Sequence, residues 1–151
     1  MHYVENVEKE DYIKMLDFLA KNCDTFSLVE GNAGIPDYPD ELPDTKKALA
    51  EYLKAENRVT SWPGTEIDVR IESGKALEHV YGCCKGSVEQ LKKSSSFFEI
   101  EEEWDMDISF FKSGQCVLFT ISHEGILMVD LDFWQDFFDG SAWMLTKAKP
   151  R

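Results

Sequence analysis

Ser122, His123 and Glu124 are three neighbouring residues whose side chains could perform hydrolytic chemistry. They connect the apolar runs QCVLFTI and ILMVDL and are followed by Gly125. A serine nucleophile requires a base and a group that orients this base, whereas adjacent residues in a turn point their side chains in different directions. We therefore predict a hairpin turn, in which Gly125 takes a positive φ. A small hydrolase or transferase that uses His123 and Glu124 remains an alternative.

The spacing of the histidines and cysteines does not indicate a metal site. His2, His79 and His123 lack neighbours at the spacings of zinc-binding motifs, and the adjacent Cys83 and Cys84 have no second ligand pair. The sequence also contains no glycine-rich loop with phosphate-binding spacing. We expect no metal and no cofactor, and we expect the four cysteines to be reduced thiols.

The uneven distribution of charge is the strongest global signal. The chain of 151 residues has a formal net charge of −13. Between Phe98 and Asp139 there are eleven acidic residues and one base, Lys112, so this segment alone carries a net charge of −10. Nucleic acid and anionic membranes are therefore disfavoured as partners, and a basic protein surface is favoured. The alternative is that the charge serves only solubility.

The acids of this segment, with one aromatic residue, are the candidate partner-binding residues. Trp104 lies within the acidic run and has the character of an interface anchor, as does Trp62 in SWPGT, although either ring could instead belong to the core. The complete candidate set is Glu99, Glu101, Glu102, Glu103, Trp104, Asp105, Asp107, Glu124, Asp132, Asp136 and Asp139.

Four segments have the pattern of helices. Apolar residues recur at helical spacing in 7–23, which Asn6 would cap, and in 44–57, which Asp44 would cap. A short helix should begin at Ser87, which has capping-box spacing to Gln90. The fourth helix lies within 130–140 and places one acidic stripe opposite its aromatic residues, formed by Asp132, Asp136 and Asp139.

The strands predict an antiparallel sheet. Alternating residues indicate half-buried strands at 24–31 and 66–72, and a turn at Pro63 and Gly64 precedes the second of these. Residues 74–84 fit a helix or a strand, and we favour a strand. Three apolar segments with short connectors predict a meander, at 106–112, 115–121 and 126–131. We therefore predict a single α+β domain over residues 1–151, with helices packed on an antiparallel sheet.

The first residues, MHYVENVEKEDY, carry acids where a secretory signal would carry bases, and no apolar run approaches the roughly 20 residues that cross a bilayer. We therefore expect a cytoplasmic protein.

Several motifs together resemble a family of known proteins. These are Trp62-Pro63-Gly64-Thr65, the alternating strand after it, ISFFKSG and LFTISHEG. Over the C-terminal two-thirds the chain resembles small acidic bacterial immunity-type proteins, the antitoxins of secreted toxin systems. The resemblance implies a cytosolic protein that binds the catalytic domain of a toxin, protects the producing cell and has no catalytic activity. The alternative is a housekeeping protein-interaction or regulatory domain.

Overall fold

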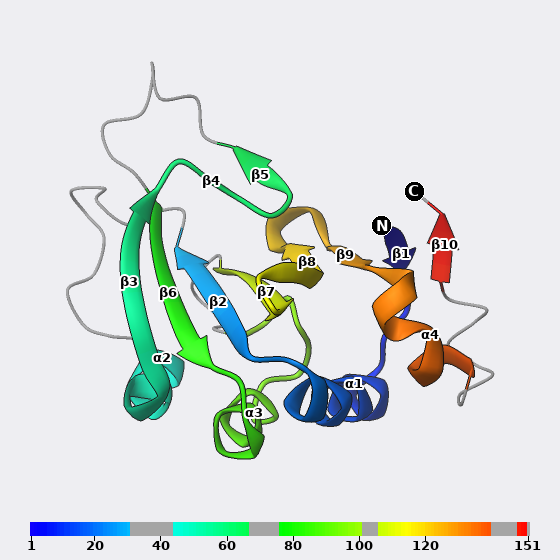
Figure 1. Cartoon of the computed structure of the whole chain (residues 1–151), viewed down its shortest axis with the longest axis horizontal. Helices are drawn as coiled ribbons and strands as arrows, with labels where there is room; N and C mark the ends of the chain where they lie inside the picture. The colour runs from blue at the N-terminus through cyan, green and yellow to red at the C-terminus, as the bar shows by residue number, and fades with distance from the viewer. Residues whose placement is uncertain (31–43, 67–75, 101–105, 140–147, 151) are drawn as a thin grey trace.

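An antiparallel sheet with helices packed on one face forms the described part of the chain (Figure 1), which is therefore an α+β protein. The computed structural model describes residues 1–30, 44–66, 76–100, 106–139 and 148–150. The helices are α1 (Lys9–Asn22), α2 (Asp44–Leu49), α3 (Lys85–Leu91) and α4 (Leu131–Asp139), with the short 3₁₀ turns η1 (Ala50–Tyr52) and η2 (Ser122–Glu124). The strands are β1 (His2–Val4), β2 (Thr25–Glu30), β3 (Leu53–Val59), β4 (Ser61–Trp62), β5 (Thr65–Glu66), β6 (Ala76–Gly82), β7 (Met106–Lys112), β8 (Gln115–Ile121), β9 (Ile126–Val129) and β10 (Ala148–Pro150).

The main sheet confirms the predicted meander. Its strand order is β10-β1-β9-β8-β7-β2-β6-β3, so β7, β8 and β9 are consecutive neighbours. The segment 74–84, for which the sequence allowed two structures, contains strand β6. Strand β2 lies between β6 and β7, with both neighbours antiparallel to it. A strand in the interior of a sheet has both of its edges satisfied, which makes β2 and its neighbours the rigid centre of the fold.

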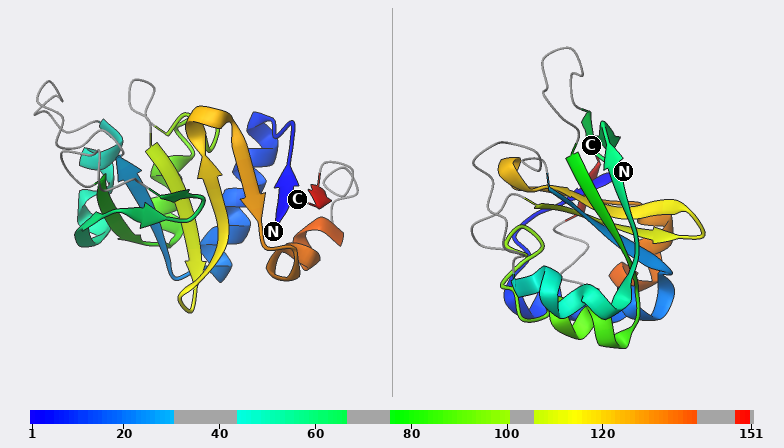
Figure 2. Two further views of the ribbon diagram at one scale, coloured as in Figure 1. Left: turned by 90° about the horizontal axis from the view of Figure 1, so that it is seen from above. Right: turned by 90° about the vertical axis from the view of Figure 1, so that its left-hand side faces the viewer.

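The helices lie together on one side of the sheet and enclose the main core (Figures 1 and 2). Tyr12 of α1 packs edge-on against Phe97 with ring centroids 4.7 Å apart, and Phe26 of β2 stacks on Tyr81 of β6 at 5.3 Å. The Tyr12 hydroxyl donates a hydrogen bond to the carbonyl of Leu91 at 2.5 Å, which ties α1 to the end of α3. Burial of the ring raises the pKa of the Tyr12 phenol.

The second face of the sheet, which points away from the helices, carries a smaller apolar cluster. Its buried members are Phe119, Ile121 and Met128. The hairpin of β4 and β5 crosses this face (Figure 2, left). A Cβ at Gly64, in the tip of the hairpin, would lie 2.6 Å from the Phe119 ring, and the residue has a φ of +86°. Glycine is required there both for the left-handed turn and for the close approach to the sheet.

Strand β2 is more deeply buried than its sequence pattern predicts. We expected one wet face, yet every residue from Phe26 to Glu30 is buried. The reason is that β2 lies in the interior of the sheet and is shielded from solvent on both faces. The polar residues Ser27 and Glu30 are therefore buried as well.

The predicted helix over 44–57 is wrong in its second half. The helical region ends at Tyr52, and Leu53–Val59 forms the edge strand β3, paired with β6. Helical spacing of Ala48, Leu49, Tyr52 and Leu53 suggested a continuous helix, but backbone pairing at the sheet edge overrides this local preference. Leu53 is accordingly 39 % exposed instead of buried.

Two predicted helix caps are also wrong. The N-cap of α1 is Glu8, in a reciprocal capping box with Asp11, while Asn6 has a φ of 57° before the helix begins. The N-cap of α3 is Cys84, and Ser87 is the third residue of the helix, where its hydroxyl accepts a hydrogen bond from the Cys84 backbone N–H at 3.0 Å. Both helices therefore begin with a capping box, in which the N-cap residue and the residue three positions later exchange hydrogen bonds.

Other expectations concern residues outside the described part of the chain. These include most of the strand predicted at 66–72. Among the described helices, none combines the length and the apolar character that a membrane span requires.

Replacing Tyr12 by phenylalanine should lower the free energy of unfolding by about 1 kcal/mol, because the Leu91 carbonyl loses one of its two donors and keeps the Ser94 backbone N–H. Urea denaturation followed by circular dichroism measures this change. Tyr3→Phe, at a half-buried tyrosine on the second face, is the matched control and should change stability by less than about 0.5 kcal/mol. Equal effects of the two variants would contradict the role of the hydroxyl in joining α1 to α3.

Candidate functional site

The segment Ser122–Gly125 is a structural turn. It forms the 3₁₀ turn η2 between β8 and β9, and Gly125 has the predicted positive φ, 66°. The Ser122 hydroxyl donates to the carbonyl of Met106 at 2.7 Å and lies 3.0 Å from the Thr120 hydroxyl. The backbone N–H of Ser122 donates to a carboxylate oxygen of Asp107 at 2.8 Å. The serine is thus used to fasten the turn to strand β7.

The neighbouring His123 and Glu124 are both exposed. His123 Nε2 lies 3.7 Å from Glu124 Oε1, with 58 % and 54 % of the two side chains accessible to solvent. A catalytic triad needs the histidine in contact with the nucleophile. Among the described residues, the polar contacts of the Ser122 side chain are to Met106 and Thr120 and do not include His123. The turn therefore contains the residue types of a catalytic triad, but its serine and histidine side chains are not in contact.

Asp107 joins two parts of the second face. Its side chain is 8 % exposed. One carboxylate oxygen accepts the Ser122 N–H, and the other accepts the indole N–H of Trp62 at 2.8 Å. Both oxygens are therefore engaged within the protein, and we remove Asp107 from the candidate partner-binding set. Trp62 is half-buried, and this bond holds its indole ring against the second face of the sheet. The ring is therefore not an outward-pointing anchor.

The remaining candidate acids that the structure describes lie in three separate segments of the chain. Glu99 is exposed after α3, Glu124 is exposed in the turn, and α4 begins beyond the opposite end of β9 (Figure 1). The four residues of β9 alone separate the turn from α4 by roughly 13 Å. The other candidates, Glu101, Glu102, Glu103, Trp104 and Asp105, lie outside the described residues.

The outer face of α4 is the most concentrated group of described candidate acids. Asp132, Asp136 and Asp139 are all exposed along it, as the sequence pattern predicts. The opposite side buries Trp134 and Phe138. The indole N–H of Trp134 donates to the carbonyl of Val117 at 2.9 Å, which fixes the helix to the sheet.

An aromatic cluster holds α4 against α1. Phe18 of α1 contacts Phe133, Trp134 and Phe137, with ring centroids 5.4, 4.8 and 5.3 Å apart. Such aromatic pairs each contribute roughly 0.5–1.5 kcal/mol beyond their buried area. The acidic stripe is therefore carried by a docked, rigid helix, with the half-buried Phe133 and Phe137 at its margin.

A small cavity of about 390 Å³ adjoins the start of α4. Asp130, Asp132 and Phe133 contribute to its wall, and Gln115 donates to Asp130 at 2.7 Å. The base in its lining, Lys112, lies 4.0 Å from Asp24, a distance at the limit of an ion pair. The cavity therefore lies between the start of α4 and the β7–β8 connection, with two acids and one base in its lining.

A buried ionic cluster was missed by the sequence analysis. Lys46 of α2 lies 2.6 Å from Glu30 of β2, with side chains 9 % and 2 % exposed. Both ring nitrogens of His79 also face carboxylates, Nε2 at 3.1 Å from Glu30 and Nδ1 at 3.5 Å from Glu56. The cluster thereby connects α2 with strands β2, β6 and the edge strand β3.

The strand pattern contained the signal for this cluster. Phe26, Leu28 and Glu30 alternate on the helix-side face of β2, so Glu30 occupies a position of the apolar series. His79 lies opposite Leu28 in the neighbouring strand and shares that face. A charged residue in register with a core face requires a buried partner of opposite charge, and the partner comes from α2.

A second cavity, of about 650 Å³, lies between α2 and α3. Its lining mixes the acids Asp44 and Glu99 with Lys93 and with serine hydroxyls. Lys93 donates to Gln90 at 2.7 Å, and Ser95 donates to Glu99. These polar groups are thus paired with one another, and the charges of opposite sign leave the cavity without the strong acidic character of α4.

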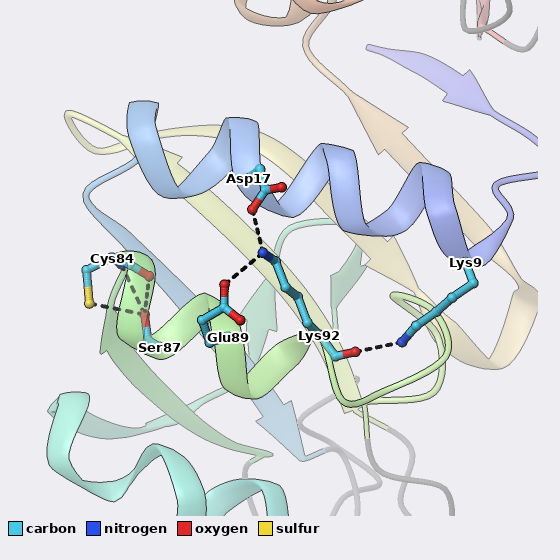
Figure 3. A network of polar contacts seen from close by, with 6 residues as sticks. All are labelled: Lys9, Asp17, Cys84, Ser87, Glu89 and Lys92. Carbon is cyan, nitrogen blue, oxygen red and sulfur yellow. Dashed lines mark hydrogen bonds and ion pairs between the residues drawn. The ribbon is translucent and has the colours of Figure 1, made fainter.

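Polar contacts between α1 and α3 are shown in Figure 3. Lys92 reaches from the end of α3 to Asp17 of α1 at 2.5 Å and to Glu89 at 2.8 Å, while Lys9 donates to the Lys92 carbonyl at 2.6 Å. Because the carboxylates are half-exposed, these pairs contribute little to stability individually. They orient α3, whose N-cap is Cys84.

The four cysteines are free thiols of two kinds. Burial raises the pKa of Cys23 and Cys83 to about 12 and that of Cys116 to about 11. Cys84 is exposed, and hydrogen bonds from the backbone and hydroxyl of Ser87 lower the pKa of its thiol. Among the described residues, no group of three or more potential metal ligands is found.

Comparisons with protein-family models, with curated proteins and with solved structures found no match to this chain. The functional argument therefore depends on the chain's own residues and their geometry.

Replacing Lys46 by methionine should destabilise the protein by about 3 kcal/mol, because the buried Glu30 carboxylate loses the ammonium group that lies 2.6 Å from it. Lys47→Met, at the exposed neighbouring position, is the matched control and should cost less than about 0.5 kcal/mol. The double variant Lys46→Met with Glu30→Gln should recover part of the loss in urea denaturation. Equal stability of Lys46→Met and Lys47→Met would show that the buried pair does not hold α2.

Iodoacetamide should modify Cys84 first, since only this thiol combines exposure with a lowered pKa. Its rate should rise with pH to a midpoint below the ordinary value of 9.0, and Ser87→Ala should move that midpoint upward because a stabilising hydrogen bond to the thiolate is lost. Mass spectrometry of peptides labelled over a series of pH values measures both. Labelling of Cys23, Cys83 or Cys116 ahead of Cys84 in the folded protein would contradict the assignment.

Proposed function

We propose that the chain is a non-catalytic immunity-type protein, which binds a cognate bacterial toxin domain at a basic surface and neutralises it. The observation that carries the proposal is the acidic outer face of α4, where Asp132, Asp136 and Asp139 are exposed on a helix that is firmly docked through its aromatic side. The resemblance of the sequence to small acidic immunity proteins agrees with this proposal.

Electrostatics supports a basic partner. Three carboxylates within nine residues of helix produce a negative field that repels nucleic acid and attracts a positive protein surface. A toxin that acts on nucleic acid must hold phosphates with basic residues, so an acidic helix face fits the same surface and covers it. Complementary fields mainly accelerate encounter, and they are weakened by salt.

The rigidity of α4 supports recognition as well. The aromatic contacts with Phe18 and the Trp134 hydrogen bond hold the helix in place before any partner arrives. A surface that is already ordered loses little conformational entropy when it binds. Half-buried Phe133 and Phe137 add apolar area beside the charges, the mixture found at the centre and rim of protein interfaces. Glu99, Glu124 and the acids of 101–105 belong to the proposed interface at most as secondary contacts.

The competing functions have weaker support. A hydrolase centred on His123 and Glu124 would need a nucleophile in contact with the histidine, whereas Ser122 is bonded to Met106 and Thr120. A housekeeping interaction domain, whose acids serve only solubility, has no need for a stripe of one sign on a single helix face. Such a domain would also show no preference for a toxin encoded beside it.

The proposal is tested by co-expression with the product of the neighbouring reading frame, followed by size-exclusion chromatography. A joint peak, with relief of any growth arrest that the neighbour causes alone, is the expected result. In the resulting complex, changing Asp132, Asp136 and Asp139 together to asparagine should slow association at least about tenfold at low salt, because steering is lost. Stopped-flow or surface-plasmon measurements give this rate.

The matched control changes three exposed acids elsewhere, Glu51, Glu66 and Glu89, to glutamine. It removes the same net charge and should slow association much less, and the difference between the two triple variants should diminish as salt is added. Equal association rates for both triple variants would show that the acids of α4 have no special part. Separate elution and no relief of growth arrest would remove the immunity function itself.

A further inference from the structure

Within the described residues, few contacts attach the β4–β5 hairpin to the main sheet. In the described part of the chain β4 and β5 have two residues each, and they pair with each other in a separate small sheet. An isolated two-stranded hairpin is marginally stable in water, so its position depends on what it touches. Two contacts with the main sheet are defined, the hydrogen bond from Trp62 to Asp107 and the close packing of Gly64 on Phe119.

Near the points where the hairpin touches the sheet, the second face contains two buried hydroxyls that have no hydrogen-bond partner among the described residues. Ser27 of β2 is 1 % exposed and Ser109 of β7 is 0 % exposed, and the two residues lie directly opposite each other. The hydroxyl oxygen of each has no partner. Buried polar side chains nearly always have one, because an unpaired hydroxyl loses its hydration without compensation.

The two hydroxyls lie next to the points where the hairpin is attached. Ser109 is opposite Phe119 in the neighbouring strand, and Asp107 is two residues earlier on the same face of β7. Phe119 and Asp107 are the residues that Gly64 and Trp62 contact. The left panel of Figure 2 shows the hairpin lying across the strands on this side.

We propose that the hairpin is a strap that opens and closes over the second face of the sheet. Asp107 holds it shut through Trp62, while the buried, unpaired hydroxyls of Ser27 and Ser109 favour the open form, in which they become accessible to solvent. Opening also uncovers Phe119 and Ile121, a small apolar surface that the closed form hides. The opening is local, because β7 and β8 remain paired with their neighbours when the hairpin leaves.

Native-state amide hydrogen exchange on the full chain, resolved by residue with NMR, tests the proposal. The amides of the hairpin should exchange at least about tenfold faster than those of β7 and β8, since they open without global unfolding. The double variant Ser27→Ala with Ser109→Ala should slow the hairpin exchange at least about fivefold, because it removes the groups that favour opening. Removing two polar groups would thus tighten the strap, which a purely structural role of the serines does not predict.

Trp62→Phe is the opposing variant and should accelerate hairpin exchange at least about fivefold, because the hydrogen bond from the hairpin to Asp107 is lost. Ser95→Ala, at an exposed serine on the helix side, is the control and should leave the hairpin rates unchanged. The single variants Ser27→Ala and Ser109→Ala serve if the double variant does not fold. Hairpin amides that exchange as slowly as β7 and β8, or that exchange at unchanged rates when the two hydroxyls are removed, would overturn the proposal.

Discussion

The arrangement of the second face of the sheet depends on the hydrogen bonds that the carboxylate of Asp107 accepts. It is buried, and it accepts one hydrogen bond from the Trp62 indole and one from the Ser122 backbone. A buried carboxylate is costly unless donors surround it, so these two bonds are a condition for the side chain to lie there. Through them one residue of β7 positions both the β4–β5 hairpin and the 122–125 turn. The turn resembles a catalytic motif only in sequence. Ser122 attaches it to strand β7, and the two residues that follow, His123 and Glu124, are exposed to solvent.

The same constraint decides which acids are available to a partner. Asp107 is consumed inside the protein, whereas Asp132, Asp136 and Asp139 remain in solvent on α4. Glu30 shows the other way in which this acidic chain accommodates carboxylates, through a buried pair with Lys46 and a contact with His79. The net charge therefore overestimates the number of acidic side chains that a partner can reach, because some of these side chains are buried. What remains concentrated and exposed among the described candidates is the stripe on α4.

Local patterns predicted the meander and α4 because their signals are short-range. Apolar runs separated by Ser113-Gly114 and by the 122–125 turn indicate hairpins, and the spacing of the α4 aromatics indicates a helix with an acidic outer face. Strand β3 could not be predicted in this way, because its pairing with β6 joins distant segments. The burial of Asp107 depends likewise on Trp62, 45 residues away. Long-range partners of polar residues leave little trace in a single sequence.

Deuterium-exchange mapping of the complex with the proposed toxin partner tests the central claim most directly. The account predicts that binding protects the α4 residues, Leu131–Asp139, from exchange, with little change in the 122–125 turn. Protection confined to the 122–125 turn, with α4 exchanging as it does in the free protein, would contradict the assignment of the binding surface to α4.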